Sequence, residues 1–380
     1  QGTARTNGSN EAFVDSDDES DRPARNPGDD VGCSHQEPAN DRPGSFSIHG
    51  RECIPRPGEQ LRRSARGLAA PIYRKVQGNQ RGSPVYETQP KIVLHDHLDG
   101  GVRPATVIDL AGEANFDLPT RDPVELSRWF TIRPGMPFAE AWQRFYVVVA
   151  VLQSAGALRR VAREAVEDLA ADGVVYAELR FAPFNHLRDG LSPDEVMAAV
   201  AAGLEEGEAA TGCVARTIIC GLRENDPEES SAAARLAARS GAARVVGFDL
   251  AGNEFDFGAR IHSDAFAIAR DAGLGITVHA GEMAGPDSIE SALEAAVPTR
   301  IGHGLHLIRD CVTGDGRIVE LGPVAREVVQ RKILLEVCVT FNSCLGTPVA
   351  SHPVRLFHDA GISVSVNADD RAITTTIWSR

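Results

Sequence analysis

The sequence has 380 residues and a formal net charge of −14 at pH 7. Coating a nucleic-acid backbone requires clustered Lys and Arg, so this acidic balance argues against a nucleic-acid partner. The length suits one large α/β barrel domain or two smaller domains, and 42% hydrophobic residues allow a sizeable core.

The cysteine content and the hydropathy of the sequence indicate in which cellular compartment the protein resides. The seven cysteines include no CxxC pair and do not form a disulfide framework in a chain of this length. No run of about 18 apolar residues predicts a membrane span, and no secretory signal is visible at the start. We therefore expect a cytoplasmic protein that does not associate with membranes.

Residues 1–85 differ in kind from the rest. They are rich in Gly, Pro, Ser, Asn, Asp and Arg and have almost no apolar periodicity. Such a stretch cannot bury enough apolar surface to offset the entropy lost on ordering. We expect a disordered or non-native extension over 1–85, followed by a catalytic domain over 86–380.

From Lys91 onward, short apolar runs alternate with Ala-rich amphipathic segments. Eight such units predict a parallel α/β fold, a (β/α)8 TIM-like barrel. The predicted strands are Ile92–His97, Val174–Arg180, Val214–Gly221, Val245–Leu250, Gly275–His279, Thr299–Gly302, Ile333–Val337 and Ile362–Asn367.

Helices are predicted between these strands, together with a helical pair around Phe138–Gln153 inserted after the first strand. Asp369 to Arg380 are too few for the usual last helix and cover, which suggests a truncated C-terminus. The other predicted helices are Ala157–Ala171, Pro193–Ala209, Pro227–Ser240, Arg260–Ala272, Ile289–Ala296, Gly322–Gln330 and His352–Ala360.

The first strand ends in KIVLHDHLDGG, which places two histidines on one face. Side chains alternate along a strand, so His95 and His97 point the same way, toward the barrel mouth. Two imidazoles so placed can bind one Zn²⁺. Polar strand-end histidines without a metal are the alternative interpretation of an isolated HxH.

Two later strands end in further candidate ligands. GITVHAGE ends the fifth strand with His279 and places Glu282 just beyond, and SVSVNADD ends the eighth with Asp369 and Asp370. A buried strand-end histidine and a solvated acidic turn are the alternatives. If the barrel closes, His95, His97, His279 and Asp369 form an N3O set with a position open for water, as in catalytic zinc sites.

The fourth and sixth strands add polar or glycine-rich ends. TRIGHGLH offers His303, which could orient or deprotonate a water, whereas His306 fits a polar residue at a helix start. VVGFDLAGNE places Gly252 where its N–H could face a substrate ring nitrogen, although a plain turn is the commoner role of such a glycine.

The motifs HDHLDGG, DLAGNE, HAGE, RIGHGLH and NADD, in this order, resemble the adenosine deaminase family of the amidohydrolase superfamily. The resemblance covers residues 89 to 380. It implies a distorted (β/α)8 barrel with one zinc ion and hydrolytic deamination of adenosine or 2′-deoxyadenosine. An inosine-type product and ammonia would result.

The resemblance also implies a role for each matching residue. His95, His97, His279 and Asp369 would bind zinc; Glu282 would protonate purine N1; and His303 would hold and help deprotonate the attacking water. The substrate contacts would be Asp370 at N7, Gly252 at N3 and Asp99 at the ribose. Because an ionised carboxylate cannot donate to N7, we expect Asp370 to be protonated, and we expect burial to raise the pKa of Glu282.

The sequence departs from the family pattern at EVCVTFNSCLG, where Val339 and Phe341 replace Pro and Ser. Arg371 stands where Pro is expected, and Leu305 where a tyrosine is also common. Substrate preference is therefore open: adenine, another aminopurine nucleoside or a pathway-specific nucleoside analogue is an alternative, as is a barrel relic that binds without catalysis. The oligomeric state is not predicted.

Two other hydrolase classes fit less well. The cytidine-deaminase signature requires HxE followed by PCxxC, and no PCxxC is present. Two-metal amidohydrolases often use a strand-four lysine, which the run from Phe248 to Glu254 lacks. A mononuclear site is therefore expected.

Overall fold

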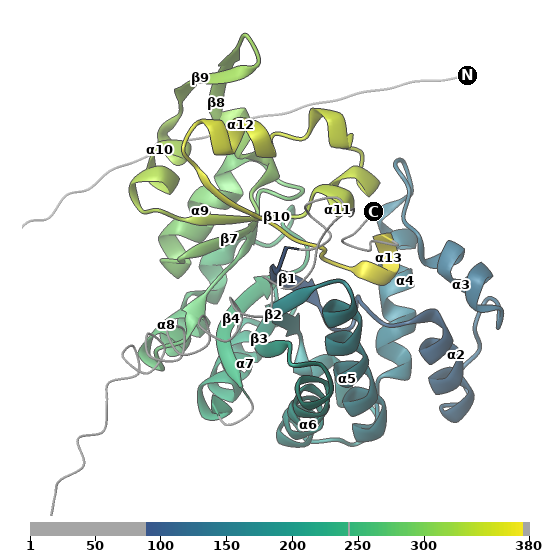
Figure 1. Cartoon of the computed structure of the whole chain (residues 1–380). Helices are drawn as coiled ribbons and strands as arrows, with labels where there is room; N and C mark the ends of the chain where they lie inside the picture. The colour runs from purple at the N-terminus through teal and green to yellow at the C-terminus, as the bar shows by residue number, and fades with distance from the viewer. Residues whose placement is uncertain (1–88, 242–243, 375–380) are drawn as a thin grey trace, which may run out of the picture. The chain divides into compact units, whose positions relative to one another are not determined.

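The computed structural model describes residues 89–241 and 244–374, which belong to the compact unit Pro55–Arg380. The predicted extension over 1–85 and the border at residue 86 lie outside these described residues. Figure 1 shows helices packed around the outside of parallel strands. The α/β class that the alternating pattern predicts is therefore present.

The strands form two parallel sheets. One has the order β1-β2-β3-β4-β5 and the other β11-β10-β7-β6. Their bounds are β1 Lys91–His97, β2 Val174–Phe181, β3 Val214–Leu222, β4 Val245–Ala251, β5 Gly275–Ile276, β6 His279–Ala280, β7 Arg300–His303, β10 Leu334–Val337 and β11 Ser363–Val366.

The two sheets meet at two irregular junctions. The predicted fifth strand is broken into β5 and β6: Thr277 N donates to Phe248 O in the first sheet, and Val278 O accepts from Gly302 N in the second. On the other side, Asp96 and Asp369 form an isolated parallel bridge. Eight strand segments thus follow one another as predicted, but the hydrogen-bond ladder is interrupted, and a continuous barrel stays a prediction.

The helices begin and end at recognisable capping residues. Six of those described start with a proline in the first turn, where the missing N–H costs nothing. Ser192 and Glu195 form a capping box on α6, and Gly212 ends that helix at φ 77°. The helices covering the strands are α5 Ala155–Ala171, α6 Pro193–Thr211, α7 Pro227–Arg239, α8 Ser263–Asp271, α9 Pro286–Ala296, α10 Pro323–Gln330 and α12 Val354–Asp359.

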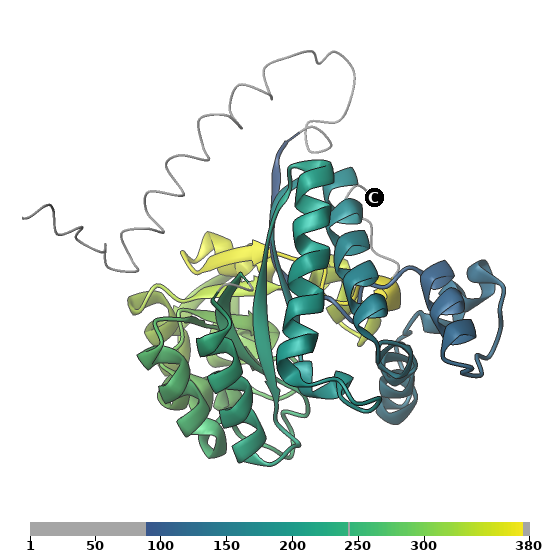
Figure 2. The same ribbon diagram turned by 90° about the horizontal axis from the view of Figure 1, so that it is seen from below.

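The insertion after β1 is larger than the predicted helical pair. It contains α2 (Pro104–Glu113), α3 (Pro123–Phe130) and α4 (Phe138–Val151), which form the blue lobe of Figure 2. The segment predicted as a helical pair is a single helix, α4, because no glycine or proline interrupts its sequence. A second unpredicted feature is the hairpin of β8 (Cys311–Gly314) and β9 (Arg317–Leu321).

One hydrophobic core lies between the sheets and their helices. Five of the strands, β1, β2, β4, β7 and β10, contribute the fully buried side chains Val93, Leu179, Phe248, Ile301 and Leu335, respectively. At about 25 cal/mol per Å² of apolar surface removed from water, this core is the main stabilising contribution. It fixes the strand ends from which the site side chains project.

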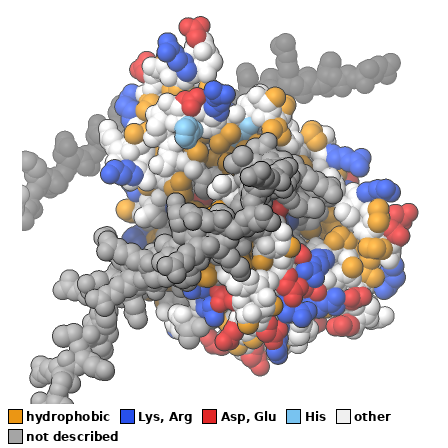
Figure 3. Space-filling model, viewed as in Figure 1, with side chains coloured by type: hydrophobic (Ala, Val, Ile, Leu, Met, Phe, Trp, Pro, Cys, Tyr) orange, Lys and Arg blue, Asp and Glu red, His pale blue; other side chains and the backbone are white. Residues whose placement is uncertain are grey.

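The outer helices pack closely and have mixed surface charges. A Cβ on Gly203 of α6 would lie 2.1 Å from Arg159 O of α5, so the close approach of these helices requires glycine there. Arg159 also pairs with Glu206 across the two helices. On the face drawn in Figure 3, basic and acidic side chains intermingle at the bottom of the molecule, where Figure 1 shows α5 and α6.

No single helix among the described residues is long and apolar enough to cross a membrane. Glu140–Val151 and Ala155–Ala171 pass the length and composition test only together, with a bend of 117° between them. The five cysteines in the described ranges carry free thiols.

A candidate metal-binding active site

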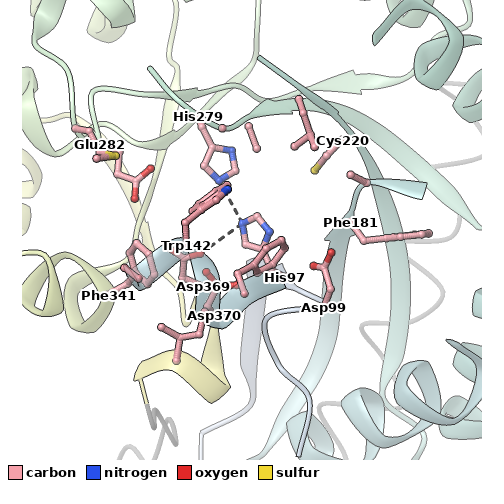
Figure 4. A pocket seen from close by; sticks show the side chains of 18 of the residues that line it. His97, Asp99, Trp142, Phe181, Cys220, His279, Glu282, Phe341, Asp369 and Asp370 are labelled. Atoms are coloured by element: carbon pink, nitrogen blue, oxygen red, sulfur yellow. Dashed lines mark hydrogen bonds and ion pairs between the residues drawn. The ribbon is translucent and has the colours of Figure 1, made fainter. Parts of the chain in front are cut away.

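Four side chains from three strand ends converge at one point. His95 and His97 lie on β1, His279 begins β6, and Asp369 follows β11. The Nε2 atom of His97 lies 3.3 Å from His279 Nε2 and 3.4 Å from Asp369 Oδ1, and His95 Nε2 lies 3.7 Å from the same Oδ1. Figure 4 shows three of these side chains directed at one another. We call the four residues the N3O cluster.

The chemistry of the N3O cluster fits a divalent cation. Two imidazole nitrogens face each other across 3.3 Å, and His95 Nε2 and Asp369 Oδ2 are buried without a hydrogen-bond partner. Buried polar atoms are ordinarily satisfied, so unpartnered atoms aimed at a common point indicate a place where a ligand binds. Three imidazoles and one carboxylate are the donors of a catalytic zinc site.

Buried carboxylates behind the cluster orient two of its imidazoles. His95 Nδ1 lies 3.1 Å from Glu336 Oε2 on β10, and His279 Nδ1 lies 3.0 Å from Asp249 Oδ2 on β4. Arg180 of β2 pairs with both carboxylates, at 2.6 Å to Asp249 and 2.7 Å to Glu336. A carboxylate at Nδ1 leaves the Nε2 lone pair free, as metal coordination requires.

The protonation preferences of His95 and Asp249 agree with a metal site. Burial, followed by the charge of Arg180, lowers the pKa of His95 well below its usual value, so its ring is neutral at neutral pH. Burial alone would raise the pKa of Asp249, but His279 and Arg180 outweigh it and hold that pKa well below its ordinary range. Neutral imidazoles backed by ionised carboxylates are the form that binds a cation.

A second, overlapping set of donors joins His95 and Asp369 to His303 and Cys338. Burial raises the pKa of the Cys338 thiol well above its usual value, which disfavours the thiolate needed for coordination. The His303 ring is also engaged at its Nδ1 by Asn342. The N3O cluster is therefore the better cation site.

Glu282, His303 and Asp370 surround the cluster on its pocket side. His303 Nε2 lies 3.6 Å from Glu282 Oε2 and 3.5 Å from Asp369 Oδ2. Burial, then the charges of Glu254 and Asp370, raise the pKa of Glu282 well above its usual value. Burial and the neighbouring Asp369 do the same for Asp370. Both carboxyls therefore favour the protonated form that the sequence predicted.

The predicted ribose contact lies apart from Glu282 in the same pocket. Figure 4 shows Asp99 and Glu282 on opposite sides of His97. Both Asp99 oxygens are buried without a hydrogen-bond partner, and burial raises the pKa of this carboxyl to about 7. His186 Nε2, 3.9 Å from Asp99 Oδ2, is also buried and unpartnered. This end of the pocket therefore offers polar atoms to a ligand.

Gly252 lines the pocket where β4 ends. Its φ is 102°, and a Cβ there would lie 2.0 Å from Glu224 Oε2. Both the conformation and the space thus require glycine.

The pocket is open to solvent at its mouth. The pocket is lined by the polar groups described above and also by apolar side chains. We call the apolar side chains the apolar wall: Ile132, Trp142, Phe145, Phe341, Leu345 and Ile373. The cavity therefore suits a planar ligand with a polar edge.

Eight of the nine residues selected from the sequence line this pocket, and the ninth, His95, lies fully buried beside Asp369. Sequence reasoning missed the supporting residues Arg180, Asp249 and Glu336, and also Asn342 beside His303. A signal was available for the carboxylates, because each interrupts a predicted apolar strand. No comparable sequence pattern marked Asn342.

This combination of parallel strands, a cation-binding cluster at their carboxyl ends and a protonated carboxyl beside it defines a metal-dependent hydrolase of the amidohydrolase type. Comparison with known proteins specifies the family. The adenosine deaminase family matches residues 90–379. The chain belongs to the adenosine deaminase family.

Curated relatives bear the same family name. The chain is 41% identical over 298 residues to the adenosine deaminase of Mycobacterium marinum, an alignment covering 77% of this chain and 82% of that protein. Its identity to the adenosine deaminase of Mycobacterium leprae is 41% over 299 residues, covering 76% and 82%.

Solved structures of similar fold include two deaminases and an amidohydrolase. An adenine deaminase from Arthrobacter aurescens has TM-score 0.68 and 25% identity, covering 76% of this chain and 85% of that one. A zinc-bound amidohydrolase from Burkholderia ambifaria has TM-score 0.69 and 25% identity, covering 80% and 82%. The N6-methyl-AMP deaminase of Arabidopsis thaliana has TM-score 0.64 and 27% identity, covering 77% and 84%.

Proposed function

We propose that this protein hydrolyses the 6-amino group of adenosine or 2′-deoxyadenosine, releasing ammonia and an inosine-type product. The observation that carries the proposal is the placement of Glu282, largely buried and with a raised pKa, beside His303 and the N3O cluster in one pocket. The adenosine deaminases of Mycobacterium, at 41% identity, support the same substrate class.

We assign one divalent cation, zinc, to His95, His97, His279 and Asp369. When bound, zinc acts as a Lewis acid that makes water a better nucleophile at neutral pH. Glu336 and Asp249 keep two of the imidazoles in the tautomer that leaves Nε2 free, and Arg180 holds both carboxylates.

The other residues bind the purine and move protons. Attack of water at C6 places negative charge on N1, which takes the Glu282 proton. Of the two protons of the water, one goes to the 6-amino nitrogen, which leaves as NH3 when the C6–N bond breaks, and the other restores the proton on Glu282. Asp370, protonated, donates to N7, and the Gly252 N–H faces N3. His303 contacts the attacking oxygen. The apolar wall stacks on the ring and excludes water.

Asp99 favours a nucleoside over free adenine. Its two buried oxygens lack partners, and ribose hydroxyls are donors that could satisfy them. Because an Arthrobacter adenine deaminase shares the fold, adenine is the second candidate substrate.

The test is ammonia release by purified, zinc-analysed protein incubated with adenosine, 2′-deoxyadenosine, adenine and AMP. We expect turnover of the two nucleosides and little of adenine or AMP. Asp99→Ala should raise KM for adenosine and leave any reaction with adenine unchanged. Stoichiometric zinc with no ammonia from any of the four would refute the proposal, and preferential turnover of adenine would establish the second candidate.

A further inference from the structure

Three buried side chains form a hydrogen-bonded chain behind the pocket. His303 ends β7, Asn342 lies in α11 (Val339–Cys344), and His352 follows the short 3-10 helix η5 (Val349–Ser351). His352 Nε2 lies 3.2 Å from Asn342 Oδ1, and Asn342 Nδ2 lies 3.3 Å from His303 Nδ1. The exposed fractions of His303, Asn342 and His352 are 1%, 0% and 7%.

The direction of this chain is fixed at its far end by the backbone. The N–H of Val354 donates to His352 Nδ1 at 3.2 Å, and a backbone N–H can only donate. Burial lowers the pKa of His352 to about 4, so the ring is neutral and carries its proton on Nε2. His352 Nε2–H therefore donates to Asn342 Oδ1.

The amide of Asn342 transmits this direction to the active site. With Oδ1 facing His352, the Nδ2 group faces His303 Nδ1 and donates to it. The reversed amide would set Nδ2 against the Nε2–H of His352, two donors in contact, and would leave both buried groups unsatisfied. The backbone of Asn342 is held as well, since its N–H donates to Cys338 O and its C=O accepts from Thr347 N.

We propose that Asn342 and His352 are positioning residues that hold His303 in its Nε2–H tautomer. The His303 N–H then points into the pocket, toward Glu282 and Asp369, as a donor to the oxygen that adds to purine C6. This inference rests on the proposed deaminase function. It extends that function by assigning His303 a hydrogen-bond donor role before the reaction starts and by giving two residues outside the pocket a part in catalysis.

Asn342→Asp is the sharpest test, because it keeps the size of the side chain and still accepts from His352. A carboxylate oxygen at the second position can only accept, so His303 must carry its proton on Nδ1 and loses the N–H directed into the pocket. We expect kcat for adenosine to fall about 10–100-fold, the range seen when a side chain that orients another is lost. KM and bound zinc should change little.

His352 offers a matched pair of variants. In His352→Gln the amide nitrogen can take the place of Nε2 and donate to Asn342 Oδ1, whereas His352→Ala removes the donor. We expect His352→Gln to keep most of the wild-type kcat. In His352→Ala, kcat should fall about as far as in Asn342→Asp. His358→Ala is the control, since this histidine is exposed and takes no part in the hydrogen-bonded chain from His352 to His303.

The tautomer itself is measurable without turnover. In ¹⁵N-histidine-labelled protein, the His303 ring signals, assigned by their absence in His303→Gln, should show a protonated Nε2 and an unprotonated Nδ1. Asn342→Asp should exchange the two. A wild-type ring protonated on Nδ1 would overturn the inference even if the protein proved active on none of the four purines. Equal kcat for His352→Gln and His352→Ala, or an unchanged kcat in Asn342→Asp, would overturn it as well.

Discussion

Two residues of the site have backbone conformations that their neighbours in the strands do not share. His303 has φ 62° and Asp369 has φ 65°, the left-handed region that non-glycine residues seldom adopt. Such a conformation costs about 1–3 kcal/mol and persists only where the surrounding structure enforces it. Here it turns an imidazole and a carboxylate out of strand geometry toward the same cavity.

At Glu282, replacing the carboxyl by an amide separates proton transfer from metal binding. Glu282→Gln keeps the shape of the side chain but has no proton to give to N1, so we expect kcat to fall about 10²–10⁴-fold. Zinc content, measured by elemental analysis, should stay at one per chain because Glu282 is outside the N3O cluster. Normal turnover by this variant would show that the proton comes from another group.

His279→Ala should have the opposite profile. It removes one of three nitrogen donors, so we expect substoichiometric zinc and loss of activity together. His306→Ala is the control of the same residue type. Because His306 is outside the N3O cluster, this variant should keep both stoichiometric zinc and activity. Tight stoichiometric zinc in His279→Ala would require a different set of ligands.

The sequence alone was sufficient to predict that the side chains at the strand ends lie close together. The alternation of strand residues places His95 and His97 together, and the barrel rule brings His279 and Asp369 to them. It was insufficient for Asn342, whose role depends on how α11 packs against the end of β7. That contact is tertiary, and no local periodicity encodes it.

At the scale of elements, the loop after β6 is held by a single carboxylate. Glu254 Oε2 accepts from the backbone N–H groups of Glu282, Met283 and Ala284 at 3.1, 2.8 and 3.0 Å, and its Oε1 accepts from Ser288 Oγ. Successive N–H groups around one anion make a rigid turn. The loop following β4 thus fixes the position of Glu282.

Glu254→Gln should loosen that turn. The amide oxygen can still accept from the three N–H groups, but a neutral acceptor makes weaker hydrogen bonds than a carboxylate, at a cost of about 1 kcal/mol or more. We expect a lower melting temperature, faster amide exchange at residues 282–284, and reduced kcat with zinc retained. Glu228→Gln, on the exposed first turn of α7, is the control. Wild-type amide protection at residues 282–284 in Glu254→Gln would mean that other contacts hold the loop.

The sequence also located most elements but not their interruptions. The run Gly275–His279 has the apolar pattern of one strand, yet it breaks at residues 277–278, where its hydrogen bonds pass from one sheet to the other. The β8–β9 hairpin was missed because few of its residues are buried: Val312 and Val319 are 54% and 55% exposed. Without a buried face, a strand has no clear alternation to detect.

At the scale of the whole catalytic unit, the N3O cluster joins the two sheets. His95 and His97 belong to the five-stranded sheet, whereas His279 belongs to the four-stranded one and Asp369 follows its strand β11. Backbone contacts between the sheets are sparse here: Asp369 N donates to His95 O, and His97 N donates to Asp369 O. A cation shared by the four side chains would therefore act as a cross-link at an irregular junction.

Removing the metal should consequently lower stability as well as activity. A ligand that binds only the folded state stabilises it by about 2.7 kcal/mol at one hundred times its Kd, which for a unit of this size is a shift of about 5 °C in Tm. We expect chelator-treated protein to melt at lower temperature and to recover on addition of zinc, but not of magnesium, which prefers oxygen donors. His279→Ala should melt low with or without zinc. A zinc-insensitive Tm in the wild-type protein would show that the two sheets are held together without the cation.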